Sequence, residues 1–151
     1  MTGTLLVLLF AALQVAELPM LVLPPGDGGW VVRIETSGGF TGRGSGSFTA
    51  SSAGEVRCVS PACPARLVPE VQQSIARLVA DIPVAGDVSL RSPAGNSGIC
   101  NDCVTTTMTV QRRNGDSERT IQFRWDESTL GTIPREVLRL HSAVVALARV
   151  Q

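Results

Sequence analysis

The chain has 151 residues, 44% of them hydrophobic and 17% charged, a composition that suits one globular domain with an ordinary packed core. Its 13 basic residues are all arginines and balance 13 acidic residues, so no large field of one sign attracts nucleic acid or an anionic membrane surface. Tyrosine is absent and histidine occurs once, which leaves few side chains for acid–base or metal sites. The composition therefore argues against nucleic-acid binding and gives little support to hydrolase chemistry.

Residues 1–23 are predicted to be a signal peptide or another apolar N-terminal segment. Leu5 to Ala16 form an apolar run interrupted only by Gln14, which has the length of a signal-peptide core and is too short to span a bilayer. An apolar segment packed on the domain, or an uncleaved anchor that continues to Leu23, are the alternatives. Residues 24–29, "PPGDGG", predict a linker, so one domain is expected over residues 30–151.

The first half of this domain predicts three strands and a helix. Residues 30–37 alternate, with Trp30, Val32 and Ile34 on one face, as a half-buried strand requires. Weaker strand patterns follow at 44–51 and 55–59. Residues 68–82 then repeat apolar side chains at helical spacing, with a proline suited to the first turn.

The second half predicts a hairpin and another helix. Residues 83–99 hold prolines and glycines with little periodicity and indicate a long loop. Residues 104–125 form two alternating runs around Asn114-Gly115, the preferred two-residue type I′ turn. Residues 133–150 place an apolar stripe on a closing helix. The order ββ(β)αββα implies an α+β fold, an antiparallel sheet of four to five strands covered on one face by two helices.

Glycines crowd the stretch "IETSGGFTGRGSGSF", residues 34–48. A dinucleotide fingerprint needs its glycines between a strand and a helix, and a P-loop needs a lysine; here a strand-like segment follows and the chain has no lysine. The pattern favours a structural turn after the first strand. Gly38, Gly39 and Gly42 are the predicted turn glycines, which reach positive φ without strain.

Four stretches of the chain resemble one known family. They are "VRIETSGGFTG", "VPEVQQSIARLVADI", "DCVTTTMTV" and "WDESTLGTIPREVLRLHSAVVAL", and together they cover most of residues 31–149. They are similar to the emfourins, small protein inhibitors of thermolysin-like metalloproteases. The resemblance implies a non-enzymatic protein without a cofactor, whose partner is a zinc metalloprotease that it blocks sterically and competitively. An exported structural or accessory domain with an unknown partner is the alternative, and nothing indicates a small-molecule substrate.

The glycine-rich turn supplies the candidate protein-binding residues, Phe40, Thr41 and Arg43. An exposed Phe40 with Arg43 beyond it would form an aromatic–guanidinium anchor of the type that dominates protein interfaces. The alternative is that Phe40 folds back onto the core and Arg43 is solvated.

The cysteines form two close pairs, Cys58 with Cys63 and Cys100 with Cys103. In a secreted or periplasmic chain an even count predicts disulfides, and proximity favours two local bridges, although cross-pairing stays open. Four thiolates could instead bind zinc, but the 36 residues between the pairs exceed the usual ribbon spacing. A redox role for "CNDC" is disfavoured because Cys103 leads into a predicted strand, not a helix N-terminus.

The histidine and the large aromatic residues are assigned to the fold. His141 lies beside the apolar stripe of the last helix and is predicted to be partly buried, since a metal site needs partners at helical spacing and none is present. Trp30, Phe123 and Trp125 are predicted to fill the core, with a surface role for Trp125 at the end of the sheet as the alternative. The sequence therefore predicts no catalytic residue and no metal ligand.

Overall fold

A computed structural model of the chain describes residues 21–38, 46–59, 63–83 and 103–147. Its elements, in chain order, are β1 (Trp30–Gly38), β2 (Gly46–Ser51), β3 (Val56–Val59), α1 (Pro69–Asp81), β4 (Val104–Asn114), β5 (Ser117–Trp125), the short 3₁₀ helix η1 (Leu130–Thr132) and α2 (Arg135–Leu147). The predicted α+β order is confirmed. Most of the predicted loop at 83–99 lies outside the described residues.

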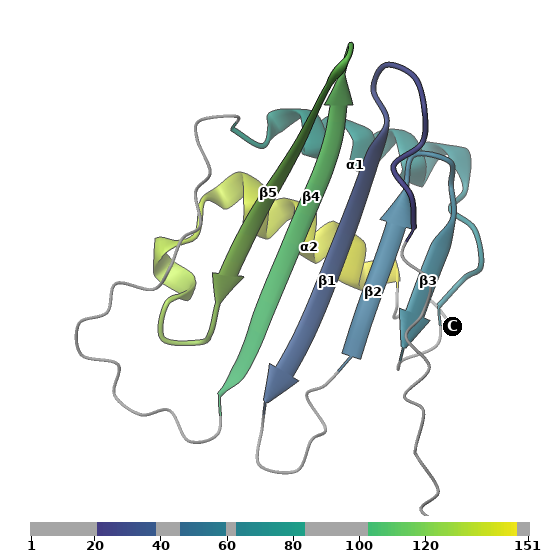
Figure 1. The fold of residues 1–151 in the computed structure, drawn as a ribbon. Coiled ribbons are helices and arrows are strands. Elements are labelled where there is room, and N and C mark those ends of the chain that lie inside the picture. The colour runs from purple at the N-terminus through teal and green to yellow at the C-terminus, as the bar shows by residue number, and fades with distance from the viewer. Residues whose placement is uncertain (1–20, 39–45, 60–62, 84–102, 148–151) are drawn as a thin grey trace, which may run out of the picture.

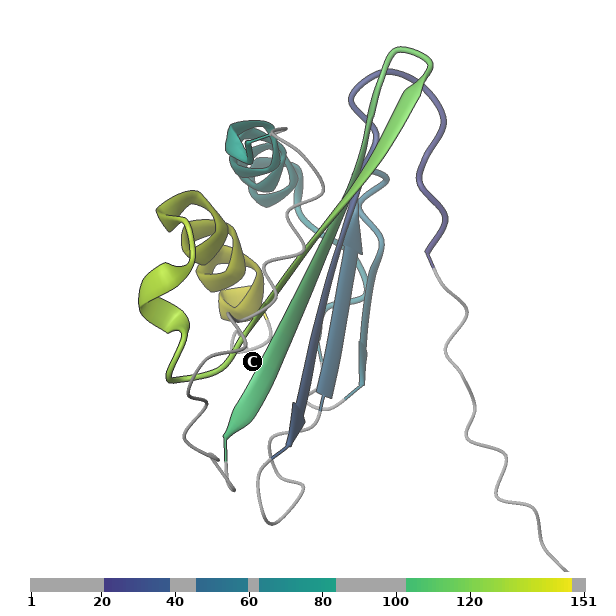
Figure 2. The same ribbon diagram turned by 60° about the vertical axis from the view of Figure 1, so that its left-hand side comes forward.

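The strands form one antiparallel sheet in the order β3-β2-β1-β4-β5 (Figure 1). The central strand β1 pairs with β2 on one side and β4 on the other, so that Ile34 stands between Phe48 and Met108. Both helices cover the same face of the sheet (Figure 2), as the sequence predicts. The opposite side of the sheet is called the helix-free face below.

The core lies between the sheet and the two helices. Val32, Met108 and Val110 are fully buried on the sheet side. Their helical partners include Ile75 and Leu140, and α1 and α2 contact each other above them. Burying one aliphatic side chain of this size contributes about 1.5–3 kcal/mol, so this layer supplies the main driving force for folding. Neither described helix is long and apolar enough to cross a membrane.

The turn of the β4–β5 hairpin differs from the prediction by one residue. Asn114 pairs with Ser117, so the two-residue loop is Gly115-Asp116 and not Asn114-Gly115. Gly115 takes the positive φ of +57° that such a loop requires. In this register Val110 stands opposite Ile121, whereas the predicted turn would set Val110 opposite Arg119. Cross-strand apolar packing therefore decides where the turn lies.

Residues 21–29, called the strap below, run beside the sheet before β1. The N–H of Gly28 donates to the carbonyl of Arg113 at 3.2 Å, and the N–H of Arg113 donates to the carbonyl of Gly29 at 2.8 Å. Asp27 Oδ1 accepts the N–H of Gly115 at 2.7 Å. The stretch predicted as a linker is thus hydrogen-bonded to the β4–β5 hairpin.

The strap also buries part of the helix-free face. Leu21 and Leu23 form a small apolar cluster with Val31, each at most 6% exposed, while Val22 between them is 84% exposed. Val31 belongs to the face of β1 that the alternation assigns to solvent. The strap therefore explains why a valine stands there.

A buried arginine joins the sheet to the end of α1. Arg112 is 7% exposed and points toward the helices, and its Nη1 donates to the carbonyls of Val79 at 3.2 Å and Ala80 at 3.4 Å. The last carbonyls of a helix lack intrahelical partners and carry the negative end of its dipole. The guanidinium donates hydrogen bonds to two of these carbonyls and places a positive charge at the negative end of the helix dipole. Arg112 therefore fixes α1 on the sheet.

We expect Arg112→Met to lower the free energy of unfolding by about 1–3 kcal/mol, because two charge-assisted hydrogen bonds to the end of α1 are lost. Arg119→Met is the matched control, since Arg119 stands opposite Arg112 in the hairpin but is exposed. Urea unfolding followed by circular dichroism measures both variants. Equal losses in the two variants would contradict the role given to Arg112.

Candidate functional site

Several chain segments meet at one end of the sheet. Because neighbouring strands are antiparallel, β1, β3 and β5 finish where β2 and β4 begin (Figure 1). This end holds Gly38, Gly46, Val59, Cys103 and Asp126, and it is called the disulfide end below. The β2–β3 turn and the β4–β5 hairpin loop lie at the opposite end.

Gly38 closes β1 in a conformation that only glycine adopts easily. Its φ is +103°, the positive value expected of a turn glycine. It pairs with Val104 on β4, and a Cβ at this position would lie 2.5 Å from the carbonyl oxygen of Cys103. The backbone of β1 therefore comes very close to the segment that enters β4.

The remaining candidates of the glycine-rich turn, Gly39, Phe40, Thr41, Gly42 and Arg43, lie outside the described residues. Their flanks are placed, because Gly38 pairs with Val104 and Gly46 pairs with Thr36. The assignment of these residues to a protein-binding turn stays a prediction.

A disulfide joins Cys58 to Cys63, with an S–S distance of 2.01 Å and a Cα–Cα distance of 6.0 Å. This local bridge is confirmed, and cross-pairing of the two cysteine pairs is wrong. Sulfur atoms bonded to each other are not thiolates, so Cys58 and Cys63 do not form half of a zinc site in this state.

The second cysteine pair is described only in part. Cys103 is also disulfide-bonded, whereas Cys100 lies outside the described residues. Cys103 stands directly before β4 and not at the N-terminus of a helix, where reactive redox cysteines are found. Its position gives no support to a thioredoxin-like redox site.

Asp126 organises the chain where it leaves β5. Its Oδ1 accepts four hydrogen bonds, from the N–H and hydroxyl of Ser128 at 2.9 and 2.6 Å and from the N–H and hydroxyl of Thr129, both at 3.0 Å. The hydrogen bond from the Ser128 side chain is the largest cause that lowers the pKa of the Asp126 carboxyl, and partial loss of hydration, the next largest cause, opposes it. The Asp126 carboxylate therefore stabilises the turn that follows β5.

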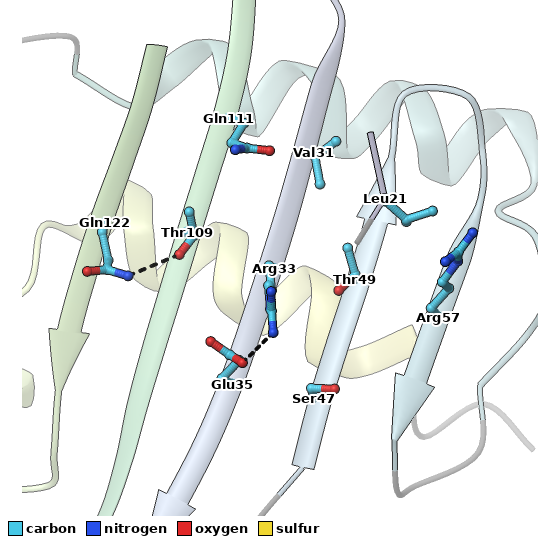
Figure 3. A pocket seen from close by; sticks show the side chains of 10 residues that line it. All are labelled: Leu21, Val31, Arg33, Glu35, Ser47, Thr49, Arg57, Thr109, Gln111 and Gln122. Carbon is cyan, nitrogen blue, oxygen red and sulfur yellow. Dashed lines mark hydrogen bonds and ion pairs between the residues drawn. The ribbon is translucent and has the colours of Figure 1, made fainter. Parts of the chain in front are cut away.

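The helix-free face carries a polar hollow of about 200 Å³ (Figure 3). Its lining comes from the strap and all five strands: Leu21, Val31, Arg33, Glu35, Ser47, Thr49, Arg57, Thr109, Gln111 and Gln122. Arg33 and Glu35 form an ion pair at 2.7 Å, and Gln122 Nε2 donates to Thr109 Oγ1 at 3.4 Å. These side chains offer hydrogen bonds and charge to a ligand or partner.

The hollow has few side chains that could act in acid–base catalysis or bind a metal ion. In the described part of the chain, no group of three or more His, Cys, Asp or Glu side chains could hold a metal ion. His141, the single histidine of the sequence, lies on α2 and therefore on the other side of the sheet from the hollow. It cannot serve as a base for a hydroxyl on the helix-free face.

His141 packs against Trp125 instead. Their ring centroids are 5.2 Å apart in an edge-to-face arrangement, and Trp125 is 6% exposed. Trp125 is thus a core residue, as predicted, and the histidine is partly buried beside it. Burial lowers the pKa of His141 below its usual value, because the charged imidazolium loses hydration there.

Two features of these surfaces were not predicted from the sequence. The side chains of the helix-free face were given no role, although the alternation of Arg33 and Glu35 with Val32 and Ile34 marks them as outward-facing. The inward position of Arg112 was not predicted either, although it continues the buried alternation of Met108 and Val110.

Comparison of the chain with known protein families, curated proteins and solved structures finds no match. The resemblance to the emfourins therefore stays a prediction.

We expect Gly38→Ala to destabilise the protein by about 1–3 kcal/mol, because alanine strains at positive φ and its Cβ meets the Cys103 carbonyl. Gly131→Ala is the matched control, since a Cβ at Gly131 meets no atom within 4 Å. Thermal unfolding compares the two variants. A Gly38→Ala protein as stable as the control would show that the end of β1 is not constrained in this way.

The partly buried position of His141 predicts an acid-sensitive fold. In the unfolded chain the His141 imidazole takes up a proton near pH 6.5, whereas in the folded protein it does so only at lower pH. The free energy of unfolding is therefore highest above pH 6.5, and it falls as the pH is lowered from 6.5 to the pKa of the folded protein. His141→Leu removes this loss, while ordinary carboxylates titrate below about pH 5. Urea unfolding at pH 7.5 and 5.5 should show a smaller difference for the variant. An unchanged difference would assign the pH effect to other groups.

Proposed function

We propose that the protein is an exported, non-enzymatic inhibitor of a thermolysin-like zinc metalloprotease and that it binds the protease through the disulfide end. The resemblance to the emfourins supplies the class of target. The observation that carries the choice of surface is the close approach of Gly38 to Cys103, at the same end of the sheet as the disulfide-bonded end of β3.

Both flanks of the glycine-rich turn are held by the sheet. On one side Gly38 pairs with Val104, and on the other Gly46 pairs with Thr36. β2 is supported in turn by β3, whose Cys58 stands opposite Phe48 and is bonded to Cys63. Fixed flanks lower the entropy that the turn loses when it binds, which is what a tight steric inhibitor requires.

The disulfide end also offers apolar contact area. Val59, at the end of β3, is 49% exposed, and Leu130, which follows the Asp126 turn, is 46% exposed. Apolar side chains are typical of the central part of a protein interface. Phe40 and Arg43 are the anchor residues that we propose.

The inhibition is steric and needs no chemistry from the inhibitor. The turn occupies the protease cleft in place of substrate, and an oxygen of Thr41 or of the backbone approaches the open coordination position of the catalytic zinc. The metal belongs to the protease, and the inhibitor carries none.

Export is part of the proposal because disulfides persist in oxidising compartments. The Cys58–Cys63 bridge and the apolar run before Glu17 together support a secreted or periplasmic location.

We expect the protein to inhibit a thermolysin-like metalloprotease competitively with a peptide substrate. Phe40→Ala and Arg43→Ala should each raise the inhibition constant at least tenfold, a loss of about 1.4 kcal/mol, because interface anchors carry most of the binding energy. Initial rates on a fluorogenic peptide at several substrate concentrations measure this effect.

Asp116→Ala is the control, since Asp116 lies in the hairpin loop at the opposite end of the sheet. Melting temperatures separate loss of binding from loss of fold. If the unmutated protein inhibits no such protease, the inhibitor function is wrong, and an exported accessory domain with another partner takes its place.

A further inference from the structure

The two edges of the sheet differ in length and in protection. The β3 edge is only four residues long, and the chain after it folds back, with an isolated bridge between Glu55 and Arg66 and a hydrogen bond from the Val56 N–H to the Ala65 carbonyl. The β5 edge has nine residues, and in the described part of the chain its only strand neighbour is β4. Among the strands that the structure describes, β5 therefore has the long edge that is available to another strand.

β5 is also a regular strand. It forms nine consecutive pairs with β4, from Asn114–Ser117 to Thr106–Trp125, without a bulge. It contains no proline, so every residue has an N–H. A strand of this kind presents a row of backbone donors and acceptors on its second edge, which is a template for pairing.

The side chains of β5 on the helix-free face follow a symmetric pattern. Glu118, Thr120, Gln122 and Arg124 are all exposed on this face, whereas Ile121, the middle residue of the strand, is buried on the other face. An acid thus lies three residues before the middle and a base three residues after it. A neutral hydrogen-bonding side chain lies one residue to either side.

We propose that β5 pairs with β5 of a second copy of this chain, antiparallel and around a two-fold axis at Ile121. In that register Glu118 of each copy stands opposite Arg124 of the other, and Thr120 stands opposite Gln122. Opposite charges that face each other across an antiparallel pair stabilise it. All nine residues of the strand take part, so full overlap of the two strands coincides with charge complementarity.

A second copy fits this edge better than an unrelated strand, because the pattern is complementary to itself. In a two-fold interface the same patch serves both sides, and each contact occurs twice. The pairing of Glu118 with Arg113 inside one copy, at 3.4 Å with the glutamate side chain 49% exposed, does not prevent this, since exposed ion pairs of this kind contribute little.

The dimer has a consequence for the proposed inhibitor. Antiparallel pairing of the two β5 strands joins both sheets into one and sends the two disulfide ends in opposite directions. If the disulfide end binds a protease, one dimer carries two such sites. The dimer itself does not depend on inhibition, and its test measures mass alone.

Sedimentation equilibrium of the unmutated protein over a range of concentrations should show a reversible monomer–dimer equilibrium. Glu118→Arg and Arg124→Glu each place like charges opposite one another, and each should raise the dimer dissociation constant at least tenfold. The double variant restores opposite charges in exchanged positions and should return the constant to within about threefold of the unmutated value, as coupled sites do.

Glu70→Arg, on the exposed surface of α1, is the charge-matched control and should leave the dimer unchanged. Melting temperatures establish that each variant is folded. A monomer at every concentration overturns the proposal, and so does a double variant no better than the single ones.

Cysteine cross-linking tests the register by a second route. The Thr120→Cys and Gln122→Cys proteins are mixed and oxidised mildly, and the mixture should form a disulfide-linked dimer in larger amount than either variant alone, because only the mixed pair is directly opposite. Equal cross-linking in all three samples, or none, overturns the proposed two-fold axis.

Discussion

The alternation of side chains on β1 is the constraint on which the rest of the structure depends. Trp30, Val32 and Ile34 face the helices, while Arg33 and Glu35 face away from them. A slip of one residue against either neighbour would move an ion pair into the core and an apolar row into water. Since β1 pairs with both β2 and β4, this single strand sets the register of the sheet and hence which segments meet at its two ends.

Two contacts convert this sheet into a closed domain. The guanidinium of Arg112 holds the last turn of α1, so the helix layer is tied to β4 by polar bonds as well as by apolar packing. On the other side, the strap covers Val31 with Leu21 and Leu23 and binds the hairpin loop through Asp27. Both contacts join parts of the chain that are far apart in sequence, and both involve the β4–β5 hairpin or the strands beside it.

The proposed functions use surfaces that do not overlap. The disulfide end lies at the termini of the strands, where Gly38 and Cys103 approach each other, whereas the proposed dimer uses the lateral edge of β5. The helices α1 and α2 cover one face of the sheet, and neither proposed surface includes them. A protease at the disulfide end and a second copy at β5 would therefore contact different sides of the molecule.

The sequence by itself determined the element order and the inward apolar residues of β1 and the hairpin, because periodicity is a local property. For the cysteines it gave only a preference for local pairing, and the structure decided the Cys58–Cys63 bridge. Only the tertiary structure decided where the hairpin turns, since that depends on Val110 meeting Ile121 across two strands. The same holds for the burial of Arg112 and for the strap. Each of these features results from contacts between residues that are distant in sequence. The free energy of those contacts outweighs what the local sequence favours: a turn at Asn114-Gly115, an arginine exposed to solvent, and a linker at residues 24–29.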